Sequence, residues 1–74
     1  MTDVRGPIEA ILYVAESPIT TQELAEVVEV PLSGIEESLA EIERELTDRR
    51  SGIVLRSVAG GWMFYTAADM LPYL

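Results

Sequence analysis

The amino-terminal part of the chain shows apolar residues at helical spacing. The first run follows Pro7 and comprises Ile8, Ile11, Leu12 and Ala15. Proline is favoured in the first turn of a helix, where its missing N–H would have no partner in any case. Ser17-Pro18 disfavours continuation, because the residue before a proline is pushed out of the helical region. The pattern therefore predicts a helix over residues 7–16.

A second helix is predicted from a capping box at Thr20-Thr21-Gln22-Glu23. In this motif the threonine oxygen accepts a backbone N–H from the glutamate, whose side chain reaches back to the threonine N–H. We expect Leu24, Val27 and Val28 to face the core, and the helix to end before Pro31.

Ser33-Gly34-Ile35-Glu36 has the same spacing as that box and predicts the start of a third helix. An apolar stripe follows, with steps of four, three and four residues, made by Ile35, Leu39, Ile42 and Leu46. The helix should fade near Arg49-Arg50, where positive charge suits the negative end of the helix dipole.

Beyond Gly52 the pattern changes to β-branched and aromatic residues. Residues 53–58 and 62–66 are predicted strands, and Ala59-Gly60-Gly61 joins them as a hairpin with glycines where positive φ is needed. Residues 67–74 are predicted to begin a further helix or a linker. Three helices followed by a hairpin give an α+β chain with winged helix-turn-helix architecture, a single domain over residues 1–74. We expect it to be part of a longer protein.

The composition removes most kinds of catalytic chemistry. The sequence has no histidine, cysteine or lysine, so imidazole bases, thiol nucleophiles, phosphate-binding lysines and thiolate or imidazole metal ligands are all missing. We therefore expect no enzymatic activity, no catalytic or metal residues, no cofactor and no small-molecule substrate. No apolar run approaches the ~20 residues that a membrane span needs, and we expect a cytoplasmic protein without membrane contacts.

The charge distribution argues against direct DNA binding by this domain. Thirteen acidic residues oppose five arginines, for a net charge of −8. In a DNA-binding winged helix the third helix enters the major groove, and basic side chains neutralise phosphates. Here that helix carries Glu36, Glu37, Glu41, Glu43, Glu45 and Asp48 against Arg44, Arg49 and Arg50. Whether these glutamates bind a partner or only solvate the helix, they would repel a polyanion.

The first helix has more apolar residues than a core stripe requires. A second stripe at spacings of three and four, roughly opposite the first, is formed by Ala10, Tyr13 and Val14. Two interpretations remain open: the stripe covers another part of the same chain, or it is the interface of a homodimer.

The hairpin raises the same question. If Ile53, Leu55, Trp62 and Phe64 face the core, the alternate residues point outward. We call these the hairpin patch: Val54, Arg56, Met63 and Tyr65. Aromatic residues, methionine and arginine are enriched in protein interfaces, so this patch is a candidate partner-binding site, although single exposed apolar residues are also common on ordinary surfaces.

Two stretches resemble the segregation and condensation protein B (ScpB) family. The first is Pro7–Ile19 with Glu23-Leu24-Ala25, which resembles the family's opening, and the second is Gly52–Trp62 with Phe64 and Thr66, which resembles its wing. The resemblance implies the amino-terminal dimerisation domain of a two-domain, non-enzymatic subunit of a bacterial condensin-like complex. Such a subunit binds the kleisin ScpA and, through it, Smc, and acts in chromosome condensation and segregation during cell division. It would be cytoplasmic and associated with the nucleoid through the complex.

A different function remains open on the residues alone. A winged helix of this kind also occurs in DNA-binding transcription regulators, and the basic surface of such a regulator would then lie outside residues 1–74. The downstream sequence distinguishes the two, because a second winged helix favours the first interpretation and a ligand-sensing domain favours the second.

Overall fold

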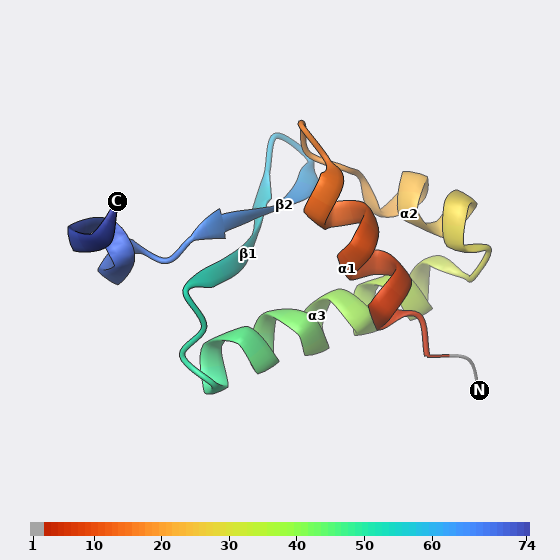
Figure 1. Ribbon diagram of the computed structural model, residues 1–74. Coiled ribbons are helices and arrows are strands. Elements are labelled where there is room, and N and C mark those ends of the chain that lie inside the picture. Colours follow the sequence, from red (N-terminus) through yellow and green to blue (C-terminus); the bar gives the residue numbers. More distant parts are fainter. Residues whose placement is uncertain (1–2) are drawn as a thin grey trace.

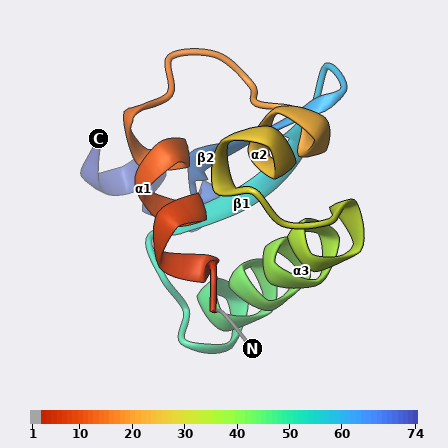
Figure 2. The same ribbon diagram turned by 90° about the vertical axis from the view of Figure 1, so that its right-hand side faces the viewer.

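Three α-helices come first in the chain and an antiparallel hairpin follows them (Figure 1). The computed structural model describes residues 3–74, except for the side chain of Asp69. The elements are α1 (Arg5–Val14), α2 (Thr21–Val28), α3 (Leu32–Asp48), β1 (Ile53–Val58), β2 (Gly61–Thr66) and a carboxy-terminal 3-10 helix (Ala68–Tyr73). In Figure 2 the hairpin lies behind α1 and α2, with α3 below them. The predicted winged-helix order is confirmed.

The core forms where the three helices meet the inner face of the hairpin. All four residues of the predicted α3 stripe are buried, and they belong to one cluster: Val4, Ile8, Leu12, Leu24, Ile35, Leu39, Ile42, Leu46 and Leu55. Trp62 and Phe64 pack against its edge and are half-buried. The helical period thus identified the inward side of α3 correctly.

The first helix is shifted from its predicted bounds of 7–16. It begins at Arg5, because the Asp3 carboxylate accepts the Arg5 backbone N–H at 3.0 Å and the buried Val4 supplies a carbonyl to Ile8 at 3.0 Å. It ends at Val14, after which Ala15 is extended. The early end frees the following residues to run beside the hairpin.

The capping box of α2 is confirmed and that of α3 is wrong. Thr20 Oγ1 accepts the Glu23 N–H at 3.0 Å, and Glu23 Oε1 accepts the Thr20 N–H at 2.9 Å. The backbone N–H of Thr20 lowers the pKa of Glu23, because this hydrogen bond favours the ionised carboxylate. In α3, by contrast, Pro31 is the cap residue and Ser33 lies inside the first turn without a capping bond. The Pro31 carbonyl accepts hydrogen bonds from the backbone N–H groups of Gly34 and Ile35.

One inward residue of α2 was also predicted wrongly. Leu24 is fully buried and Val28 is half-buried, but Val27 is 68% exposed. With only eight residues, α2 presents a narrow apolar side to the core. Val27 falls outside that side, although its spacing from Leu24 is helical.

The hairpin turn contains Ala59 and Gly60, both with positive φ, at 49° and 78°. Two such residues between paired strands form a type I′ turn, whose twist matches that of the strands. Gly61 is different: it begins β2 without positive φ and lies against the chain before α2. There Ile19 and Trp62 exchange two backbone hydrogen bonds, of 3.0 and 2.7 Å. Gly61 is needed for this close approach and not for the turn.

We expect Gly61→Ala to destabilise the domain by about 1–3 kcal/mol, the usual cost of overpacking. A Cβ at this position would lie 2.9 Å from Pro18 Cβ and 3.0 Å from the Ile19 backbone. Urea unfolding would measure the loss. Gly6→Ala is the matched control, because a Cβ there would meet nothing within 4 Å. Equal stability of the two variants would show that the Ile19–Trp62 contact does not restrict position 61.

Candidate protein-interaction surface

The second apolar stripe of the first helix lies on the solvent side of α1, and we call its residues Ala10, Tyr13 and Val14 the α1 patch. Tyr13 is 82% exposed and Val14 is 73% exposed, and Ala10 is exposed one turn earlier. The opposite side of the same helix buries Ile8 and Leu12. The two stripes predicted for this segment therefore exist, and the second one is free of contacts that would cover it within the described chain.

The hairpin patch is brought together by the strand register. Val54 is paired with Tyr65 and Arg56 with Met63, so all four side chains share one face. Arg56 and Tyr65 are exposed, whereas Val54 and Met63 are half-buried. On the opposite face Leu55 is buried against the core. Ile53, at the end of the strand, was expected to face the core but is 38% exposed.

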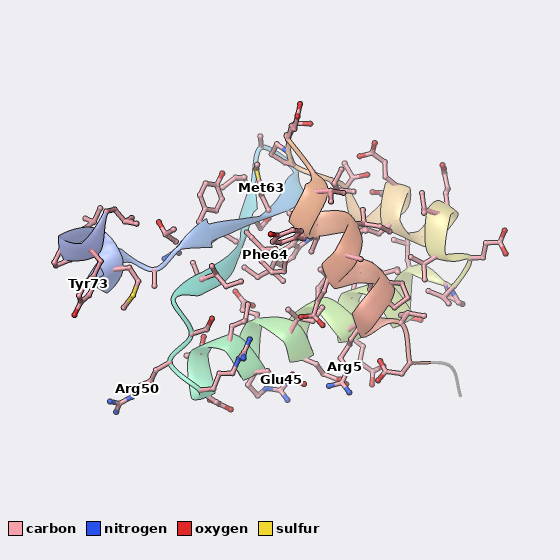
Figure 3. All side chains as sticks on the ribbon, in the orientation of Figure 1. Arg5, Glu45, Arg50, Met63, Phe64 and Tyr73 are labelled. Atoms are coloured by element: carbon pink, nitrogen blue, oxygen red, sulfur yellow. The ribbon has the colours of Figure 1, made fainter. Side chains whose placement is uncertain are left out.

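An apolar hollow of about 250 Å³ connects the two patches. It lies between the end of α1 and the hairpin, and its lining residues are Leu12, Tyr13, Ala15, Ile53, Met63, Phe64, Tyr65 and Thr66. Figure 3 shows Phe64 between the hairpin and α1. The lining carries no charged side chain. The sequence predicted two separate patches, and the structure brings one residue of the first, Tyr13, and two of the second, Met63 and Tyr65, to the same hollow.

The acidic residues are gathered elsewhere. Nine of the thirteen lie between Glu23 and Asp48, and none lies between residues 49 and 68. Except for the half-buried Glu41, the carboxylates of α3 are exposed. We call the exposed side of α2 and α3 the acidic face. It is separate from the apolar hollow, so the molecule has one strongly negative side, whereas the charged residues of positions 49–68 are Arg49, Arg50 and Arg56.

Arg5 is held by carboxylates of its own chain. Its guanidinium lies 3.1 Å from Asp3 Oδ2 and 3.3 Å from Glu41 Oε2, and it also contacts Glu45, as Figure 3 shows. The hydrogen bond from Arg5 lowers the pKa of Asp3, and the bond to Asp3 together with the neighbouring charges raises the pKa of Arg5. One of the five arginines is thus already neutralised, which leaves the acidic face negative.

A second hollow, of about 370 Å³, opens beside Arg5. Its lining residues are Asp3, Val4, Arg5, Val30, Pro31, Gly34, Glu37, Ser38 and Glu41. Three carboxylates against one paired guanidinium make it unfavourable for a phosphate or another anion. Among residues 3–74 no three acidic side chains converge in a manner that could hold a metal ion. No helix in the same range is both long and apolar enough to cross a membrane.

The carboxy-terminal residues were predicted to begin a helix or a linker, but the sequence patterns did not mark them as a candidate interaction surface. Ala68–Leu74, here called the C-terminal segment, carries exposed Leu71, Tyr73 and Leu74. Its apolar run Met70-Leu71-Pro72-Tyr73-Leu74 is visible in the sequence. Because the run is short and contains a proline, it has no clear helical or strand period that would indicate which side chains are exposed.

The comparisons with known proteins are consistent across sequence and structure. The family model for "Segregation and condensation complex subunit ScpB" matches residues 6–74. Segregation and condensation protein B of Desulforamulus reducens is 34% identical over 70 residues, which cover 95% of this chain and 39% of that protein. The same protein of Myxococcus xanthus is 41% identical over 63 residues, which cover 85% of this chain and 19% of that one. The chain therefore spans well under half the length of these relatives.

Two solved structures share the fold. ScpB from Mycobacterium tuberculosis superposes with a TM-score of 0.92 at 37% identity, over 99% of this chain and 48% of that one. A dimer of an ScpB amino-terminal domain complexed with an ScpA peptide superposes with a TM-score of 0.89 at 22% identity, over 95% of this chain and 88% of that one. Because the family model covers nearly the whole chain, this protein belongs to the family of segregation and condensation complex subunit ScpB.

Proposed function

We propose that this chain is a protein-interaction domain of a bacterial condensin-like complex, which self-associates and helps to bind the kleisin subunit ScpA. Through the kleisin it would act with Smc in chromosome condensation and segregation, as a cytoplasmic, nucleoid-associated and non-enzymatic component. The observation that carries the proposal is the apolar hollow between α1 and the hairpin, whose lining has no charged side chain although the domain is strongly acidic.

Family membership and the related dimer support the proposal. The ScpB amino-terminal domain of similar fold was crystallised as a dimer with an ScpA peptide. Exposed tyrosine and half-buried methionine are residue types that interface cores favour. The lack of histidine, cysteine and lysine supports a binding role over catalysis, because carboxylates on an open helix have no desolvated cleft that would separate their pKa values.

The geometry suggests a division of work between the two patches. The α1 patch is the proposed dimer interface, because it is the most exposed apolar surface on a helix of the domain. The hairpin patch is the proposed kleisin contact, with Val54, Met63 and Tyr65 accepting apolar side chains. The acidic face would favour basic residues flanking that segment, through complementary charge. A small domain offers limited area, so we expect it to supply only part of the kleisin affinity.

Met63→Glu is expected to weaken binding of an ScpA fragment from the same organism at least about tenfold, because burying a carboxylate among apolar side chains without a partner is costly. Isothermal titration calorimetry would measure the dissociation constant. Val27→Glu is the matched control, with the same added charge on an exposed residue of α2.

Sedimentation of both variants separates this effect from a change in self-association. If the wild-type chain shows no kleisin binding, or if Met63→Glu binds as tightly as Val27→Glu while both self-associate equally, the hairpin patch does not contact the kleisin.

A further inference from the structure

We propose that the C-terminal segment of one copy places its apolar side chains in the apolar hollow of a second copy, and receives the partner's segment in return. This inference rests on the proposed self-association and names the contact that forms it. The juxtaposition that carries it is an unfilled apolar hollow and an uncovered apolar segment, both beside the hairpin of the same domain.

Charge restricts how two copies approach each other. Each copy carries a net charge of −8, and most of its carboxylates lie on the acidic face. Two such faces repel, so a symmetric pair is favoured only when both face away from the contact. Residues 49–68 contain no acidic side chain and include the whole hairpin. The hairpin, whose charged residue is Arg56, is therefore the surface on which two copies meet at the lowest electrostatic cost, and the C-terminal segment beside it adds one acidic residue, Asp69.

The C-terminal segment supplies apolar side chains that its own copy leaves uncovered. Leu71 is 68% exposed, Tyr73 is 82% exposed and Leu74 is 77% exposed. In Figure 1 the segment extends away from the helices, and Figure 3 shows Tyr73 at its far side. Adjacent exposed apolar residues of this size are unusual unless they are covered by another surface.

The hollow has the size and chemistry that these side chains need. Its volume of about 250 Å³ can receive a leucine or tyrosine side chain. Tyr13, Ile53 and Tyr65 are exposed at its rim. An occupant of the hollow would also cover apolar surface of these side chains and remove it from water, which stabilises the contact. Because the lining contains no charged residue, an apolar occupant would not bury an unpaired charge.

The anchoring of the segment favours exchange between copies over folding back onto the same copy. The Ala67 N–H donates to the Gly52 carbonyl at 2.8 Å, and Ala67 is buried. The Met70 side chain lies over Gly52, where an added Cβ would be 3.5 Å from its sulfur. These contacts fix the start of the segment beside the link between α3 and β1. The residues beyond it are thereby directed away from the hollow of their own copy.

A symmetric exchange makes the contact twice. In a twofold dimer each copy contributes one segment and one hollow, so a substitution in either removes both contacts of the homodimer. A mixture of two different variants behaves otherwise. A copy with a damaged segment and a copy with a damaged hollow still form one intact contact, between the good segment of one and the good hollow of the other.

This complementation is the test. The segment variant is Leu71→Asp with Tyr73→Asp, and its control is Val27→Asp with Leu32→Asp, which adds the same two charges to exposed residues of α2 and α3. The hollow variant is Tyr13→Glu, and its control is Val27→Glu, which adds the same single charge. Sedimentation velocity would give the dissociation constants, and circular dichroism would verify that each variant is folded. We expect each interface variant alone to self-associate at least tenfold more weakly than its control. An equimolar mixture of the segment and hollow variants should recover heterodimers of intermediate affinity, detected with one variant labelled.

The outcomes separate the exchange from the proposed function. If the segment variant self-associates like its control, or if the mixture recovers nothing, the exchange is wrong while self-association through the α1 patch stands. If the wild-type chain remains monomeric at high concentration, the exchange and the proposed self-association both fail. Met63 and Tyr65 belong both to the hairpin patch and to the lining of the hollow, so ScpA binding is measured on the segment variant, whose hairpin patch and hollow are unchanged. If this variant binds the ScpA fragment while Met63→Glu does not, the kleisin contact stands separately from the exchange.

Discussion

Leu39→Ala is expected to leave a large fraction of the domain unfolded. Leu39 is 1% exposed at the centre of the α3 stripe, where all three helices and β1 contribute to one cluster. Truncating a buried leucine to alanine costs about 2–5 kcal/mol, because the energetic cost of the cavity adds to the lost transfer free energy of the side chain. Small domains bury a modest fraction of their surface, so their total stability lies near the low end of the usual ~5–15 kcal/mol. The substitution therefore removes much of the available stability.

Urea unfolding followed by circular dichroism would measure this loss. Leu32→Ala is the matched control, because it is the same substitution in the same helix at a leucine that is 42% exposed. We expect the control to change the free energy of unfolding far less than Leu39→Ala. Similar losses at both positions would mean that the stripe does not hold the core together.

The elements with a strong period or a local hydrogen-bonding motif could be predicted from the sequence. The α3 stripe has a regular helical spacing, and burial followed it at all four positions. The α2 capping box needs only residues three apart, so its bonds are set by local chemistry. The hairpin was marked by β-branched and aromatic residues on both sides of a glycine-containing turn. In each case the determining interactions lie within a few residues along the chain.

Features set by contacts between distant segments were predicted less well. The spacing of Ser33 and Glu36 matched a capping box, but the helix begins two residues earlier, with Pro31 as its cap, so Ser33 cannot be the cap. The shift of α1 depends on the burial of Val4 and on the pairing of Ile19 with Trp62, neither of which has a local signal.

The candidate surface shows the same limit. The α1 and hairpin patches were each predicted as exposed stripes, because a period separates the two sides of an element. Their meeting at one hollow depends on how α1 packs on β2, and the period contains no information about that angle. The C-terminal segment gave no periodic signal at all, and its exposure became evident only from the way Ala67 is anchored to Gly52.

Tyr13→Glu is expected to shift the chain from dimer to monomer while leaving it folded. Tyr13 is 82% exposed in the described chain, and glutamate is a good helix former, so the substitution disturbs neither the core nor α1. In the proposed dimer the same side chain lies at the rim of the hollow in both copies. Interface tyrosines that become fully desolvated commonly contribute about 2 kcal/mol or more each. Two lost contacts, about 4 kcal/mol together, would therefore raise the dissociation constant by roughly 10³-fold.

The introduced charge adds to this effect. Each glutamate would have to be buried in an apolar contact without a partner, and the two copies already repel through their net negative charge. Raising the salt concentration screens that long-range repulsion, but it does not restore the buried apolar contact. The loss of dimer affinity in Tyr13→Glu should consequently remain at high salt, whereas a loss caused only by charge repulsion would be reversed. Analytical ultracentrifugation at low and high salt would distinguish the two, with Val27→Glu as the charge-matched control on the other side of the domain. A Tyr13→Glu chain that dimerises as strongly as Val27→Glu at both salt concentrations would remove the α1 patch from the interface.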